Sequence, residues 1–218
     1  MMKLSPLTLL LFISLFSFAE KGMVVTQKFT DANVKASVTV TWYVTESACK
    51  MKMEFSDDKV KSVSWFIPDY SSNQLLTYAE GEIPAGAQKT YYAIPVAGIK
   101  SSNSATDFKI ERTGETKTIG GINCEKIIAR ATSSTTEMWV TKDFNAALYN
   151  AASFFANSIE LSILKAQKIT GVSLESMTKD SSGKTLNAYS LVSAISTTLN
   201  PADFAVPEAY KLAEVGKH

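Results

Sequence analysis

The strongest constraint on the fold is a strict alternation of residue types between Val34 and Thr45. One set of alternate positions is entirely apolar, and the other set is mostly polar. The apolar set is Val34, Ala36, Val38, Val40, Trp42 and Val44. A period of two places the two sets on opposite faces of an extended chain. The segment is therefore predicted to be a β-strand with one buried face and one exposed face.

The next segment repeats this pattern after a short connection at 46–48. Cys49, Met51, Met53 and Phe55 alternate with lysine and glutamate, so the two segments predict an antiparallel hairpin. Further short strands are expected along the chain. They cover Val63–Ile67, Gln74–Tyr78, Lys89–Val96, Phe108–Arg112, Glu115–Ile119, Ile122–Ala131, Thr135–Thr141, Gly171–Thr178 and Lys184–Ser196. The polar segment 98–107 is expected to be an exposed loop.

The spacing of apolar residues changes at Asp143, which is a suitable helix N-cap. Apolar side chains then recur every three or four residues and fall on one helical stripe. They are Phe144, Leu148, Ala151, Phe155, Ile159 and Ile163. We expect one long helix of roughly five to six turns. The predicted fold class is α+β, mainly antiparallel β, with a strongly curved sheet (a half-barrel) and this long helix packed on its concave side.

The first nineteen residues have the pattern of a secretory signal peptide. Lys3 precedes an apolar run at 4–18 that is too short to span a bilayer as a helix. Small residues at Ser17 and Ala19 suit a signal peptidase, so cleavage is predicted after Ala19. An uncleaved anchor is the alternative. The prediction is a signal peptide at 1–19, a single domain at 20–218, and a periplasmic or secreted product.

The charge balance limits the partners of such a product. Cleavage would remove Lys3, one of 22 basic residues, and leave all 21 acidic residues, so the mature chain would be formally neutral. A neutral chain does not favour nucleic acid or an anionic membrane surface, because both attract proteins through basic charge. No later segment is apolar enough to span a membrane. We therefore expect no nucleic-acid partner and no membrane-spanning segment after cleavage.

The two cysteines, Cys49 and Cys124, fall in predicted strands. In an oxidising compartment a pair of cysteines tends to form a disulfide. Such a bond would close a loop of about 75 residues and stabilise the fold by roughly 4 kcal/mol in the chain-entropy model. Two buried free thiols are the alternative. We predict the disulfide.

Catalytic and metal chemistry are disfavoured by the residue types. The only histidine is His218, so a Ser-His-Asp or Cys-His mechanism lacks its base. The adjacent Asp57 and Asp58 suit a solvated hairpin tip better than an acid pair. Glu80 and Glu82 lie in a loop that lacks the ligand density of a calcium site. We expect no enzyme activity, no metal site and no cofactor, and a hydrolase is the least favoured class.

Large apolar side chains recur on successive predicted strands and on the helix. A sheet lined in this way can hold an apolar ligand, and methionine provides adaptable surface. The residues predicted to line such a site are Trp42, Met51, Met53, Phe55, Trp65, Phe155 and Ile159. The alternative is that they form an ordinary core beneath the helix.

Three segments resemble a known family in their order and residues. They are Thr116–Lys126 (TKTIGGINCEK), Thr136–Asp143 (TEMWVTKD) and Asp203–Lys211 (DFAVPEAYK). This order resembles exported bacterial proteins of a domain-of-unknown-function family, which is similar to the lipoprotein-localisation-factor (LolA-like) superfamily. The resemblance implies a bent antiparallel sheet covered by helix, and carriers with this fold bind acyl chains in the concavity. It brings no catalytic residues.

The closing segment also has a mechanical interpretation. Phe204 and Val206 could insert at the sheet edge, Pro207 would end the strand, and Tyr210 would pack back to hold the C-terminal segment in place. We favour this role over ligand binding for these residues.

Two functional hypotheses follow. The first is a non-enzymatic exported protein that binds a lipid, an acyl chain, a lipidated polypeptide or another apolar ligand between sheet and helix. The second is a packed structural or interaction module of the cell envelope, with a protein partner and no small ligand.

Overall fold

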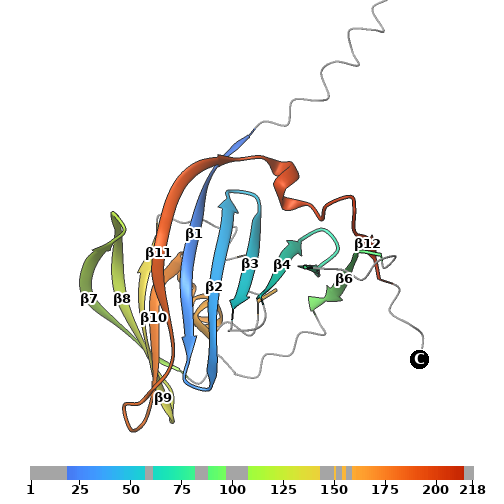
Figure 1. Cartoon of the computed structure of the whole chain (residues 1–218). Coiled ribbons are helices and arrows are strands. Elements are labelled where there is room, and N and C mark those ends of the chain that lie inside the picture. Colours follow the sequence, from blue (N-terminus) through green and yellow to red (C-terminus); the bar gives the residue numbers. More distant parts are fainter. Residues whose placement is uncertain are drawn as a thin grey trace, which may run out of the picture.

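A computed structural model describes residues 19–56, 61–81, 88–96, 108–142, 150, 154–155 and 159–213. Twelve strands in these segments form one sheet (Figure 1). The strands are β1 (Glu20–Asp31), β2 (Val34–Thr45), β3 (Cys49–Ser56), β4 (Lys61–Asp69), β5 (Gln74–Glu80), β6 (Thr90–Pro95), β7 (Lys109–Ile119), β8 (Ile122–Arg130), β9 (Ser134–Thr141), β10 (Val172–Asp180), β11 (Thr185–Leu199) and β12 (Lys211–Leu212). Two helices lie in the described segments from end to end: α2 (Ile159–Ala166) and the 3-10 helix η5 (Pro201–Phe204). The predicted mainly antiparallel β class is confirmed.

The sheet consists of two meanders that meet in the middle. Its strand order is β12-β6-β5-β4-β3-β2-β1-β11-β10-β9-β8-β7. Strands β1 to β6 form one meander and β7 to β11 form the other, and antiparallel pairing of β1 with β11 joins them. The short β12 pairs with β6 in parallel. The central pairing therefore joins the first strand of one meander to the last strand of the other.

The predicted apolar face of β2 is confirmed where its side chains are described, since Val38, Val40, Trp42 and Val44 are all buried. The side chains of Val34 and Ala36 lie outside the described part of the chain. The opposite face is less exposed than predicted, because Thr41 and Thr45 are buried as well. Residues directly opposite each other on neighbouring strands share a face, and Trp42 lies opposite Met51 of β3. We call the face that carries these residues the inner face, and the opposite face the outer face. The strand β1 was not predicted, although it occupies the middle of the sheet.

The inner face continues across the second meander. Phe29 of β1 lies opposite Tyr189 of β11, which lies opposite Ser176 of β10, and Ser176 lies opposite Met138 of β9. Helix α2 packs on this part of the face. Its Ile163 and Leu164, among other buried residues, form a core cluster with Ile127 and Met138. A larger cluster covers the inner face of β1 to β3.

The prediction of one continuous helix from Asp143 to Ile163 is wrong. Phe154 and Phe155 lie in a turn, and α2 begins only at Ile159. The sequence before Ile159 is Asn157-Ser158, two residue types that favour helix N-caps over helix interiors. The apolar period runs through Phe154 and Phe155 without interruption, so it could not show the turn at these residues.

The strongly curved half-barrel is also a correction. The sheet is open and is not strongly curled, and its end strands β7 and β12 lie on opposite sides of the molecule (Figure 1). Closing a sheet requires strand tilt and a staggered register around the whole ring. Alternation along each strand carries no information on either quantity, so the sequence could not decide the curvature.

The prediction of a disulfide is wrong, because the thiols of Cys49 and Cys124 are both reduced and buried. Cys49 lies in β3 and Cys124 in β8, and five strands separate these two in the sheet order. Neighbouring strands are roughly 4.8 Å apart, whereas a disulfide needs Cα atoms within about 7 Å. Burial raises the pKa of the Cys49 thiol to about 12. The alternative of two buried thiols therefore holds.

The C-terminal segment packs on the outer face. Tyr210 is buried with its ring 4.6 Å from that of Tyr78, and its hydroxyl donates to the Ala79 carbonyl at 3.1 Å. The edge strand is formed by Lys211–Leu212, so Phe204 and Val206 do not insert at the sheet edge as expected. They line a hollow over the outer face instead. The expected packing of Tyr210 is confirmed.

Candidate functional site

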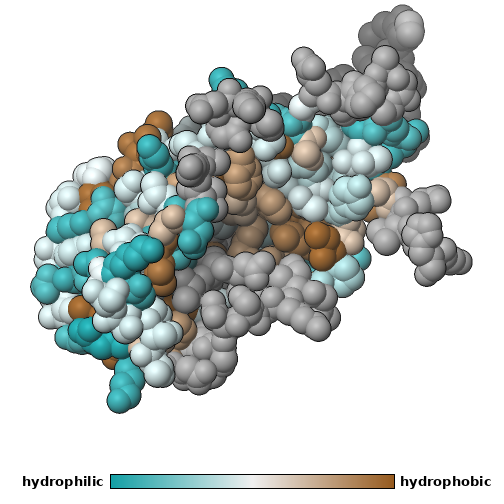
Figure 2. Space-filling view, turned by 60° about the horizontal axis from the view of Figure 1, so that its bottom comes forward, coloured by the Kyte–Doolittle hydropathy of each residue, from teal (hydrophilic) through white to brown (hydrophobic). Residues whose placement is uncertain are grey.

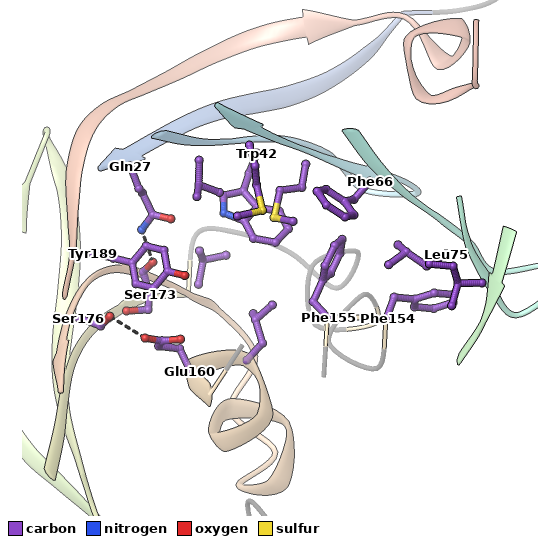
Figure 3. Close-up of a pocket in the computed structure, with 16 residues that line it drawn as sticks. Gln27, Trp42, Phe66, Leu75, Phe154, Phe155, Glu160, Ser173, Ser176 and Tyr189 are labelled. Carbon is purple, nitrogen blue, oxygen red and sulfur yellow. Dashed lines mark hydrogen bonds between the residues drawn. The ribbon is translucent and has the colours of Figure 1, made fainter. Parts of the chain in front are cut away.

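The central feature of the inner face is a pocket of about 530 Å³ between the sheet and the segment that contains Phe154, Phe155 and α2 (Figure 3). Its lining residues come from both meanders. They are Gln27, Val40, Trp42, Met51, Met53, Phe66, Leu75, Ile94, Phe154, Phe155, Glu160, Leu161, Val172, Ser173, Ser176 and Tyr189. A hollow lined by apolar surface is visible in the middle of the face shown in Figure 2. The pocket volume lies in the range of about 300–1,000 Å³ that is typical of small-molecule sites.

Aromatic contacts build the apolar wall of the pocket. Trp42 and Phe155 meet edge to face with ring centroids 5.1 Å apart. Tyr70 and Phe154 meet in the same way at 5.3 Å. This geometry suits the charge distribution of aromatic rings. Phe155 therefore packs against Trp42 of the sheet, and Phe154 packs against Tyr70 in the turn after β4.

Polar side chains gather at one end of the pocket, beside β10 and the start of α2 (Figure 3). Gln27 is buried, and its Nε2 donates to the carbonyls of Ser173 and Leu174 at 2.9 Å each. Ser176 Oγ donates to Glu160 Oε1 at 2.9 Å. Buried polar groups need such partners, because an unsatisfied group costs about 1–3 kcal/mol. The pocket therefore combines an apolar body with one polar end.

The buried carboxylate influences a neighbouring phenol. Burial raises the pKa of Tyr189 above its usual range, and the negative charge of Glu160 raises it further. Tyr189 thus keeps its proton at neutral pH and can act as a hydrogen-bond donor. Its ring lies 4.7 Å from that of Phe29 on the inner face.

Four of the seven predicted lining residues lie around the pocket: Trp42, Met51, Met53 and Phe155. Phe55 lies further along β3, is 36% exposed and does not line the pocket. Ile159 is the first residue of α2, and its side chain is outside the described part of the chain. Contact of these residues with a ligand stays a prediction.

Trp65 lies on the outer face, where it does not line the pocket. It is opposite Lys52 of β3, whereas its neighbour Phe66 is opposite Met51 on the inner face. Its indole Nε1 donates to Glu80 Oε1 at 2.8 Å, and Lys50 Nζ lies 4.0 Å from its ring centre. Both faces of β4 carry apolar residues, so alternation alone could not show which of them turns inward.

The hollow beside Trp65 on the outer face lies between the sheet and the segment that contains η5. Lys50 Nζ donates to the Asp203 carbonyl at 2.9 Å, and burial lowers the pKa of Lys50. The cation also faces the indole, an arrangement that is favourable through cation–π attraction. These contacts hold η5 against the sheet.

The polar end of the pocket was missed by sequence reasoning. Gln27 lies in the unpredicted strand β1, and Glu160 lies in the segment assigned to a long helix. Ser173, Ser176 and Tyr189 were assigned to strands without a role. A buried Gln27 at an apolar position of an alternating run (Met23, Val25, Gln27, Phe29) was the one available signal.

Four of the residues that the sequence disfavours for catalysis or metal binding lie outside the described part of the chain: Asp57, Asp58, Glu82 and His218. Glu80 is described and accepts the hydrogen bond from Trp65. Within the described segments, no group of three or more His, Cys, Asp or Glu side chains is arranged to hold a metal ion. No helix in the same segments is long and apolar enough to cross a membrane.

Comparison with protein families gives a match over most of the chain. The family described as Domain of unknown function (DUF4412) matches residues 22–210. A comparison with curated proteins gives no match.

Solved structures share the fold at low sequence identity. The MucA/MucB complex of Pseudomonas aeruginosa contains a chain with a TM-score of 0.50 and 10% identity over 87% of this chain. This chain spans 56% of that one, about half its length. An uncharacterized conserved protein from Thermus thermophilus has a TM-score of 0.50 and 12% identity, and the alignment covers 90% of this chain and 91% of that one.

A putative outer membrane lipoprotein-sorting protein domain from Vibrio parahaemolyticus also aligns, with a TM-score of 0.35, 8% identity, and coverage of 84% of this chain and 88% of that one. The expected resemblance to a family of unknown function is confirmed, and the fold is MucB-like.

Proposed function

The chain belongs to the DUF4412 family, and we propose that it is a non-enzymatic exported protein that binds an apolar ligand in the central pocket. The observation that carries the proposal is the pocket itself. Most of its lining is aliphatic, aromatic or methionine, and its volume is about 530 Å³. Apolar walls with a few placed polar groups are typical of small-molecule sites.

Three of the lining residues suit an elongated apolar ligand. Trp42, Met51 and Met53 are contributed by neighbouring strands of the sheet and lie close together on the inner face. Methionine side chains adapt to ligands of different shape because they are flexible and polarisable. A lipid, an acyl chain or the lipid group of a lipidated polypeptide fits this surface.

Export supports the choice of ligand. The pattern of residues 1–19 is that of a cleavable secretory signal. We propose that the domain after it acts in the periplasm or outside the cell, where apolar molecules need a carrier to pass through water. The sequence contains a single histidine, His218, and this scarcity of general bases favours binding over catalysis.

The test is to produce the chain with its own first nineteen residues, to collect it from the periplasm without detergent, and to record native mass spectra. We expect one equivalent of bound lipid that is lost on organic extraction. The extracted protein should then take up N-phenylnaphthylamine, an uncharged apolar probe, with a change in tryptophan fluorescence. A uniformly ligand-free mass together with no uptake of the probe would contradict the proposal.

A polypeptide partner is the second candidate. The shared fold includes MucB, which was solved in complex with MucA, and β11 of this chain exposes Val192 and Ile195 by 63% and 57%. Exposed apolar side chains on a strand suit contact with another protein. Crosslinking in intact cells would recover such a partner. A partner that is bound equally well by a variant with a blocked pocket would favour this candidate.

A further inference from the structure

The polar end of the pocket carries information on the headgroup of the ligand. Its side chains come from four elements: Gln27 from β1, Glu160 from α2, Ser173 and Ser176 from β10, and Tyr189 from β11. Phe66, Phe154 and Leu75 lie toward the other end (Figure 3). An occupant that satisfies both ends has an apolar tail and one polar head.

Most hydrogen-bond donors at this end are already used within the protein. Both N–H groups of the Gln27 amide point to backbone carbonyls. Ser173 Oγ donates to the Glu175 carbonyl at 2.9 Å, and Ser176 Oγ donates to Glu160. A hydroxyl that has donated its hydrogen has only acceptor lone pairs left. Gln27 Oε1 and the two serine oxygens can therefore only accept.

Glu160 adds a carboxylate to these acceptors. It is only 6% exposed and lines the pocket. Burying a carboxylate is costly unless hydrogen bonds or opposite charge compensate. Its position in the first turn of α2 and the hydrogen bond from Ser176 provide part of this compensation. An anionic headgroup placed here would meet a like charge and a set of acceptors.

We infer that the ligand is an amphiphile whose headgroup donates hydrogen bonds, as an ammonium or a hydroxyl group does, and that a free carboxylate head is rejected. This inference rests on the proposed function, since it assumes that the pocket is a ligand site. It deepens that function by naming the headgroup chemistry. Among the described side chains at this end, Tyr189 lies beside Glu160 and can still donate.

The test compares three probes with the same dodecyl-length tail: dodecylamine, monolaurin and laurate. Each probe displaces N-phenylnaphthylamine from the extracted protein below its critical micelle concentration. We expect the amine and monolaurin to bind at least about tenfold more tightly than laurate, because hydrogen bonds to charged groups contribute about that factor or more. The preference for amine over laurate should shrink in Glu160→Gln, which keeps the size of the side chain and removes its charge.

Glu137→Gln is the matched control. Glu137 lies in β9, has a side chain that is 38% exposed, and does not line the pocket. Glu137→Gln changes the net charge by the same amount as Glu160→Gln. Because Glu137 lies outside the pocket, this variant should keep the wild-type preference for the amine over laurate. The urea midpoint of each variant shows whether it folds. If a variant fails to fold, the comparison of the three probes in the wild-type protein still tests the inference.

The outcomes separate the two proposals. Equal binding of all three probes, or tighter binding of laurate, overturns the headgroup inference and leaves apolar binding intact. An unchanged preference in Glu160→Gln also overturns it, because the discrimination would then not come from this carboxylate. No displacement by any probe and no uptake of N-phenylnaphthylamine overturns the proposed function, and the inference with it.

Discussion

Replacing Val40 by phenylalanine tests whether the pocket is open space. Val40 and Val38 lie on the same strand and the same face and are buried alike, at 3% and 2% exposed, but only Val40 lines the pocket. In Val40→Phe the four added carbons can enter the pocket. Burying one carbon group stabilises a fold by about 0.8 kcal/mol, so the four together can add roughly 3 kcal/mol to the free energy of unfolding. Strain reduces this gain. We expect a free energy of unfolding at or slightly above the wild-type value, with loss of probe uptake.

Val38→Phe is the matched control for the same substitution in a packed position. Inserting extra carbons into a close-packed core costs about 1–3 kcal/mol. Equilibrium unfolding in urea measures both variants, with an unchanged m-value as the check that midpoints can be compared. If Val40→Phe is destabilised as much as Val38→Phe, the interior is packed at both positions. The pocket would then not exist in solution, and the packed interaction module would be the better hypothesis.

Three further predictions concern the stability of the fold. Tyr210→Phe should lower the free energy of unfolding by about 1 kcal/mol, because it removes the hydrogen bond to the Ala79 carbonyl; no change in the urea midpoint would show that this bond contributes nothing. Cys49 and Cys124 should react with iodoacetamide only after unfolding, because both are buried and the pKa of Cys49 is about 12; rapid labelling of the native protein, or an intact mass lower by two hydrogens, would contradict this. Hydrogen bonds from two serines lower the pKa of Asp69 from 3.8 to about 2, so its contribution is present above about pH 4 and is lost as the pH falls toward 2. Asp69→Asn should remove that part of the pH dependence, by less than about 1 kcal/mol because the site is exposed, and an identical pH profile of both proteins would refute it.

Much of the sheet was predictable because its physics is local. The boundaries predicted for Val34–Thr45 agree with β2, and the hairpin with Cys49, Met51 and Met53 is present. Alternation succeeds there because the apolar face is buried, although Thr41 and Thr45 of the opposite face are buried as well. It fails for Trp65 and Phe66, since β4 has apolar contacts on both faces and its orientation depends on register with β3.

The candidate site was predictable only on its apolar side. Trp42, Met51, Met53 and Phe155 are large apolar residues in periodic segments, and such residues are expected inside. The polar end was not predictable. Gln27 and Glu160 are 133 positions apart in the sequence, and only the fold brings them to the same pocket. A polar residue in an apolar run shows that something unusual is buried, but not what it faces.

The sequence by itself therefore determined the local state of the chain: which segments are extended, which faces are apolar, and which catalytic chemistry lacks its residues. The tertiary structure decided everything that depends on long-range pairing. Pairing of β1 with β11 joins the two meanders, leaves five strands between those of Cys49 and Cys124, and places Gln27 next to the carbonyls of β10. The physical reason is that side-chain patterns act within a few residues, whereas strand order and register are chosen by the total burial of the folded chain.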